Sequence, residues 1–127
     1  MASCRHGWAT RRVLVIEDEG LIATLAVEML AEEGYEVQRA GDGRAALDLL
    51  RAWAPCLILL DIMMPVMDGR AFLRELRRPE AVAVPPVVVM SAAGGPLLSD
   101  LGMEVADVIR KPFRLELLLE IVDRLAR

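Results

Sequence analysis

Short apolar runs alternate with stretches of helical periodicity along the chain. The apolar runs are rich in Val, Ile and Leu and are four to six residues long, which is typical of strands rather than of buried helices. The pattern predicts strands at 12–16, 35–40, 56–60, 87–90 and 105–110. It predicts helices at about 20–33, 44–53, 70–78, 96–102 and 114–127.

The order of these elements predicts the fold class. Strands that alternate with helices form right-handed crossovers, which give a parallel sheet covered by helices on both faces. We therefore expect an α/β protein with a five-stranded, doubly wound parallel sheet and five helices. The run from Cys56 to Leu60 is apolar throughout, so we place it at the centre of the sheet. The stretch from Tyr35 to Ala40 is half polar, which favours a place nearer an edge.

Composition narrows the class of protein. A chain of 127 residues is long enough for one domain, and only 4% aromatic residues make its core aliphatic. We expect a flexible leader at 1–11, without the apolar segment of a signal peptide, and a domain at 12–127. The net charge of −4 argues against direct nucleic-acid binding, and no apolar run approaches the ~18 residues of a membrane span. Cys4 and Cys56 lack a metal-binding spacing, so we expect reduced thiols in a cytoplasmic protein.

Polar residues stand where the predicted strands end. Glu17 and Asp18 follow the first strand, Asp61 the third, Ser91 the fourth and Lys111 the fifth. The carboxyl ends of parallel strands meet at one edge of the sheet, where open α/β sheets bind ligands. Clustered carboxylates repel one another unless a cation joins them, and oxygen ligands suit Mg²⁺. A lysine and a hydroxyl opposite that cation suit a phosphoryl group, and a carboxylate between them can act as the nucleophile.

Four short motifs make the sequence resemble the receiver domain of bacterial two-component response regulators, the CheY-like superfamily. The motifs are Glu17-Asp18-Glu19, the segment from Asp61 through Pro65 to Asp68-Gly69, Ser91-Ala92, and Lys111-Pro112-Phe113. The resemblance extends from about Arg12 to Arg127, and the order of the motifs makes it specific. It implies the flavodoxin-like receiver fold and a role in two-component or phosphorelay signalling.

The resemblance also implies a role for each site residue. Asp61 matches the phospho-accepting aspartate. Glu17 and Asp18 match the acidic pair that organises Mg²⁺, and the backbone carbonyl of Met63 would complete the metal ligands. Ser91 and Lys111 match the residues that bind the phosphoryl group.

Three positions depart from the family pattern or qualify it. Val108 stands three residues before Lys111, where the family usually has an aromatic switch residue, so coupling through a swinging ring is in doubt. Met63 and Ala93 stand two residues after Asp61 and Ser91, at the positions that flank the hydrolytic water in the family. Neither side chain orients water by a strong hydrogen bond, so we expect slow self-dephosphorylation and no further enzyme activity.

Two predicted helices carry more apolar residues than a half-buried helix needs. In the family, the first helix docks the histidine kinase or phosphotransfer protein. We therefore expect exposed residues such as Leu21 to bind that partner. The last helix, with residues such as Leu119, would join the fourth helix and fifth strand in a possible homodimer.

The sequence is most consistent with a single-domain response regulator receiver that accepts a phosphoryl group from a phosphohistidine partner onto Asp61. A phosphorylation-independent pseudo-receiver is the main alternative, and Val108 leaves it open. An aspartyl-phosphate hydrolase would want an acid/base carboxylate two residues after the nucleophile, where Met63 stands.

Overall fold

Nine elements make up the part of the chain that the structure describes. The structure, a computed structural model, describes residues 11–18, 20–61, 69–76, 85–92, 105–111 and 113–126. The strands are β1 (Arg12–Ile16), β2 (Glu36–Ala40), β3 (Leu57–Asp61), β4 (Val87–Ala92) and β5 (Asp107–Lys111). The helices are α1 (Gly20–Glu32), α2 (Gly43–Leu50), α3 (Gly69–Leu76) and α4 (Leu115–Ala126).

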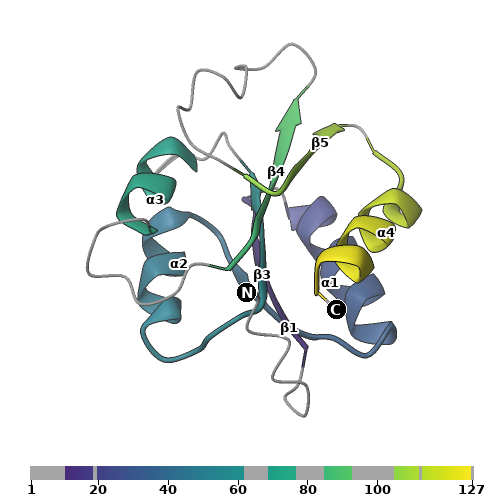
Figure 1. The fold of residues 1–127 in the computed structure, drawn as a ribbon, viewed down its shortest axis with the longest axis horizontal. Helices are drawn as coiled ribbons and strands as arrows, with labels where there is room; N and C mark the ends of the chain where they lie inside the picture. Colours follow the sequence, from purple (N-terminus) through teal and green to yellow (C-terminus); the bar gives the residue numbers. More distant parts are fainter. Residues whose placement is uncertain are drawn as a thin grey trace.

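The five strands form one parallel sheet in the order β2-β1-β3-β4-β5, which confirms the predicted fold class (Figure 1). The chain moves outward from β1 to β2 and then crosses back to β3 on the other side of β1. Such a reversal leaves a crevice at the carboxyl ends of the two central strands, where ligands bind in sheets of this kind. Glu17 and Asp61 stand at those two strand ends.

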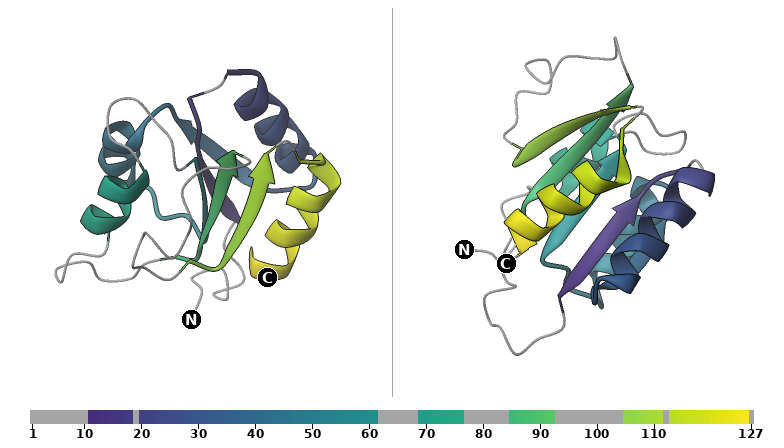
Figure 2. Two further views of the ribbon diagram at one scale, coloured as in Figure 1. Left: turned by 90° about the horizontal axis from the view of Figure 1, so that it is seen from above. Right: turned by 90° about the vertical axis from the view of Figure 1, so that its right-hand side faces the viewer.

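Helices cover both faces of the sheet, so that the core has two layers. α1 and α4 lie on one face, and α2 and α3 lie on the other (Figure 2). Side chains alternate along β3: Leu57 and Leu59 join the core beneath α1 and α4, whereas Ile58 and Leu60 join the core beneath α2 and α3. All five residues of β3 are buried, as expected for a central parallel strand.

Local signals place two of the helix ends. Gly34 has a φ of 98°, and its N–H and that of Tyr35 donate to the carbonyls of Ala31 and Leu30, a Schellman motif that ends α1. The Asp42 side chain accepts the N–H of Ala45 at 2.9 Å and caps the start of α2. Both ends lie within one residue of the predicted helix bounds at 33 and 44.

The end of α2 differs from the prediction, which carried this helix to Trp53. The helix ends at Leu50, because the N–H groups of Arg51 and Ala52 donate to carbonyls three residues back and tighten the last turn. The predicted helix at about 96–102 lies outside the described residues, as does the predicted leader up to residue 10. Among the described residues, no helix is long and apolar enough to cross a bilayer.

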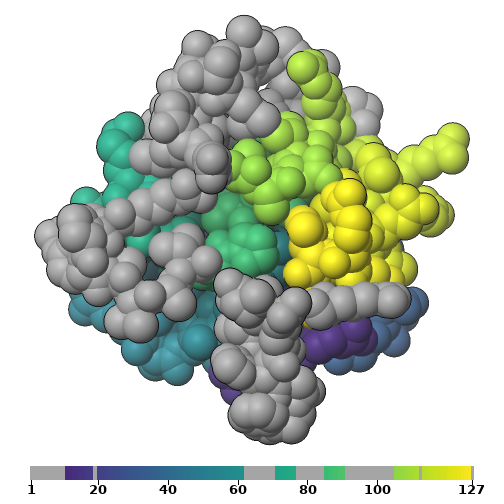
Figure 3. All heavy atoms as spheres, viewed as in Figure 1, coloured from purple at the N-terminus to yellow at the C-terminus, as the bar shows by residue number. Residues whose placement is uncertain are grey.

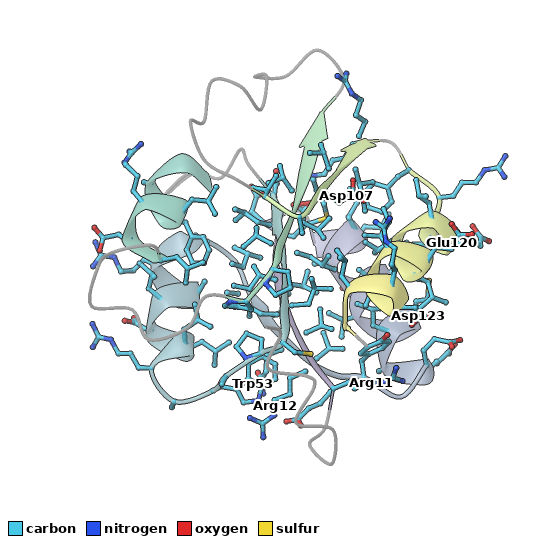
Figure 4. All side chains as sticks on the ribbon, in the orientation of Figure 1. Arg11, Arg12, Trp53, Asp107, Glu120 and Asp123 are labelled. Carbon is cyan, nitrogen blue, oxygen red and sulfur yellow. The ribbon has the colours of Figure 1, made fainter. Side chains whose placement is uncertain are left out.

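Side chains tie the elements together at the amino ends of the strands (Figure 4). The Glu36 carboxylate accepts hydrogen bonds from Arg12 and from the Trp53 indole, both at 3.3 Å. The Arg11 guanidinium lies 4.3 Å from the centre of the Tyr35 ring. The Tyr35 hydroxyl donates a hydrogen bond to Asp123 of α4. These contacts stabilise the end of the fold that is opposite to the carboxyl ends of the strands.

The expectation of reduced thiols is wrong for Cys56, which is disulfide-bonded. Cys4 lies outside the described residues. The Cys56 N–H donates to the Arg12 carbonyl at 2.8 Å, so Cys56 sits beside the point where the leader joins β1. Separation along the sequence does not reveal this proximity, because it arises only when β1 and β3 pair.

Candidate functional site

The candidate site lies at the carboxyl ends of β1, β3 and β5. Glu17 follows β1, and Asp61 and Lys111 are the last residues of β3 and β5. Glu17 is 0% exposed and Asp61 is 5% exposed, so two acidic groups are buried at one edge of an aliphatic core. Buried carboxylates need compensating charge or hydrogen bonds, which makes this edge the place to look for chemistry.

The backbone of Glu17 is fixed by the neighbouring strand. Its N–H donates to the carbonyl of Ala40 at 3.1 Å. Its carbonyl accepts two hydrogen bonds from the Arg39 guanidinium, at 3.3 Å from Nε and 3.1 Å from Nη2. Arg39 was not among the predicted site residues. No sequence signal marks it, because an arginine on an edge strand usually points into solvent.

The Lys111 ammonium joins the two buried carboxylates. Its Nζ lies 2.6 Å from Oε2 and 3.2 Å from Oε1 of Glu17, and 3.4 Å from Oδ2 of Asp61. The side chain of Lys111 is only 17% exposed, so both ion pairs are shielded from water. The closer partner of Lys111 is therefore Glu17 and not Asp61.

The charges of this cluster perturb one another. Burial, the hydrogen bond with Asp61 and the negative charge of Asp61 together raise the pKa of Glu17 to about 8, against the opposing effect of Lys111. Burial alone would lower the pKa of Lys111. The hydrogen bonds and charges of Glu17 and Asp61 together outweigh burial, and the pKa of Lys111 is raised. Below a pH of about 8, Glu17 therefore keeps a proton, which reduces the negative charge that the single ammonium has to balance.

Three carboxylates of this edge are placed to hold a metal ion. Oxygen atoms of Glu17, Asp18 and Asp61 all lie within 4.8 Å of one another, with Asp18 exposed to solvent. Carboxylate oxygens are the ligands that Mg²⁺ prefers, often with water completing its shell. The pKa of Glu17 is raised mainly by burial and also by its hydrogen bond with Asp61 and by the charge of Asp61. A divalent cation would favour the ionised form of Glu17, so these residues fit such an ion.

The other predicted site residues are placed only in part. Ser91 belongs to β4, beside Arg110 in the register, but its side chain lies outside what the structure describes. Met63 and Ala93 also lie outside the described residues. Val108 is half-buried on β5, opposite Val89, and its N–H donates to the Asp107 side chain at 2.7 Å.

A doubly wound sheet with buried acidic groups and a lysine at its carboxyl edge defines a class of α/β proteins whose function lies in that crevice. Within this class the chain belongs to the response regulator receiver domain family, whose sequence model matches residues 13–123. The predicted family is thereby confirmed.

Solved structures agree with this assignment. The receiver domain of NtrX from Brucella abortus is 33% identical, with a TM-score of 0.78 over 90% of this chain and 97% of that chain. The receiver domain of the sensor histidine kinase PA1611 from Pseudomonas aeruginosa PAO1, which has a magnesium ion coordinated in its active-site cleft, is 30% identical. Its TM-score is 0.80, over 93% of this chain and 98% of that chain. The receiver domain of a signal transduction histidine kinase from Syntrophus aciditrophicus is 31% identical, with a TM-score of 0.80 over 92% and 90% of the two chains.

Proposed function

We propose that this receiver domain is a phosphorylation switch that accepts a phosphoryl group from a phosphohistidine partner onto Asp61. The observation that supports this most strongly is the position of Asp61. It is a buried carboxylate at the end of the central strand, with an ammonium 3.4 Å from Oδ2 and with Glu17 and Asp18 beside it. Asp61 and Lys111 therefore stand where a nucleophile and its charge partner are required.

The proposed transfer uses these residues in named roles. A carboxylate oxygen of Asp61 attacks phosphorus, the bond from phosphorus to the histidine nitrogen breaks, and that nitrogen leaves with the electron pair. Lys111 then pairs with an oxygen of the new acyl phosphate, and we assign Ser91 the hydrogen bond to another. Glu17, Asp18 and Asp61, with the predicted Met63 carbonyl, would hold Mg²⁺, which supplies positive charge for the phosphoryl oxygens.

We assign docking of the phosphohistidine partner to α1. The side chains of Leu21 and Leu25 are 72% and 40% exposed, so α1 presents two large apolar residues to solvent. Beside them a cavity of about 170 Å³ is lined by Ile22, Leu25, Lys111, Phe113 and Leu115. Its apolar wall ends at the lysine of the site, so a partner helix seated there would bring its histidine toward Asp61.

The expectation for the last helix needs one correction. Leu119 packs against the core, whereas Leu117 is the exposed leucine of α4, at 44%. α4 and β5 lie together on the surface (Figure 3). A homodimer through this face stays a prediction.

A cytoplasmic location also stays a prediction for this chain, because it is general for receiver domains.

Phosphorylation can be tested by mass. The protein is incubated with Mg²⁺ and acetyl phosphate, and its intact mass is compared with that of Asp61→Asn and of Asp48→Asn, a matched change at an exposed aspartate of α2. We expect one phosphoryl adduct in wild type and Asp48→Asn, lost slowly, and none in Asp61→Asn. Equal adducts in all three would show another acceptor. No adduct in any would favour the pseudo-receiver.

Docking can be tested with the exposed leucines. Leu21→Ser should slow transfer from a phosphorylated histidine-containing partner but not from acetyl phosphate, because only the protein donor needs the α1 surface. Leu117→Ser is the matched control and should leave both rates unchanged. Equal slowing by the two changes would place docking elsewhere.

A further inference from the structure

The ion pair between Glu17 and Lys111 reaches across most of the sheet. Lys111 belongs to the edge strand β5, and Glu17 follows β1, with β4 and β3 between them. Neighbouring strands are about 4.8 Å apart, so these backbones are roughly 14 Å from each other. The two side chains must therefore extend toward one another, and they meet beside Asp61.

The length of Glu17 makes this contact possible. Aspartate is shorter by one methylene, about 1.5 Å. The backbone of Glu17 cannot shift to compensate, because Ala40 holds its N–H and Arg39 holds its carbonyl. An aspartate at this position would leave its carboxylate beyond hydrogen-bond distance of Nζ, with Asp61 as the nearer partner.

We propose that the Glu17 carboxyl group is the resting partner of the Lys111 ammonium, and that this contact must open before Lys111 can contact a phosphoryl group on Asp61. Glu17 is then a positioning residue, held in place by Arg39. Its carboxyl oxygens compete with the phosphoryl group for the ammonium. The same carboxylate is one of the three placed to hold a cation, so the cation and Lys111 compete for Glu17. Competition with a phosphoryl group rests on the proposed function, whereas the contact between Glu17 and Lys111 in the unphosphorylated protein does not.

The chain offers a direct probe of the resting pair, because Lys111 is its only lysine. Selective ¹⁵N-lysine labelling therefore gives one side-chain ammonium signal by NMR. In metal-free buffer we expect Glu17→Gln and Glu17→Asp to move or broaden this signal more than Asp61→Asn does. Glu36→Asp is the matched control, a glutamate of β2 paired with Arg12 at the other end of the sheet, and it should leave the signal in place. A larger effect from Asp61→Asn would overturn the proposal.

Competition with the phosphoryl group is measured with beryllofluoride, a phosphoryl mimic, at saturating Mg²⁺. Glu17→Asp should bind the mimic about tenfold more tightly than wild type, equivalent to 1.4 kcal/mol, because no glutamate competes for the ammonium. Glu36→Asp should bind it as wild type does. Equal or weaker binding by Glu17→Asp would overturn the competition. If the wild-type protein forms no Asp61-dependent phosphoryl adduct, the proposed function is wrong. The ammonium signal would still test whether Glu17 is the resting partner of Lys111.

Discussion

The raised pKa of Glu17 makes the stability of the metal-free protein depend on pH in an unusual direction. The pKa of this carboxyl is about 8 in the folded protein, against an ordinary value of 4.5. Between these values the folded protein keeps a proton that the unfolded chain has lost. Stability must therefore fall as the pH rises through this window, and it stops falling above the folded pKa. Lys111 adds nothing to the slope there, because its pKa is raised above 10.5.

The size of the effect follows from the same two values. A tenfold change in proton affinity corresponds to 1.36 kcal/mol, so the full rise is worth about 5 kcal/mol. Most of that window lies between pH 5 and pH 8, and we expect a loss of about 3 kcal/mol over this range. The side chain of Glu17 is 0% exposed, so water does little to screen the effect.

Urea unfolding, followed by far-ultraviolet circular dichroism in buffers with a chelator, measures this loss. Glu17→Gln is the control, because its amide keeps the shape and can still accept from Lys111 but does not titrate. The wild-type free energy of unfolding should fall with pH relative to that of Glu17→Gln. Added Mg²⁺ should reduce the fall, because a cation favours ionised Glu17. Parallel profiles for the two proteins would refute the reasoning.

Three further outcomes are expected. Phe72→Ala should lower the free energy of unfolding in urea by about 3–5 kcal/mol, because Phe72 is fully buried. Leu117→Ala, at an exposed site, is the control and should change it by less than about 0.5 kcal/mol. Asp42→Ala should cost about 1 kcal/mol through loss of the cap on Ala45, and Asp42→Asn should cost less, so equal losses would contradict a capping role. In native protein without reductant, Cys56 should resist alkylation, as read by peptide mass, and reductant should make it reactive.

The sequence was sufficient for the elements that rest on local signals. Apolar runs with β-branched residues marked the strands, and their alternation with helices predicted the parallel sheet. The predicted end of the first helix and start of the second lie within one residue of the observed ones, where Gly34 and Asp42 form the caps. The residues at the strand ends could be predicted as a group, because the parallel sheet alone brings them to one edge. Glu17, Asp61 and Lys111 do meet there.

Features that depend on distance across the fold could not be predicted. The hydrogen bonds from Arg39 to the Glu17 carbonyl require the pairing of β1 with β2. The closer contact of Lys111 with Glu17 depends on side-chain reach across several strands. In α4, apolar residues surround so much of the helix that periodicity did not separate packed Leu119 from exposed Leu117.

Lys111 connects the chemistry at Asp61 to the surface of a chain that has Val108 in place of an aromatic ring. Its ammonium contacts Asp61, but its backbone is part of β5 and is paired with Ala92 of β4. Lys111 also lines the cavity beside α1, together with Phe113 and Leu115. A phosphoryl anion on Asp61 would attract this ammonium away from Glu17, and the stem would carry the displacement to β5 and to the start of α4. A half-buried valine can only follow such a movement of its strand, because it has no ring to rotate. If Asp61 is phosphorylated as proposed, we therefore predict that readout in this chain depends on the backbone of β5 and on its packing against α4.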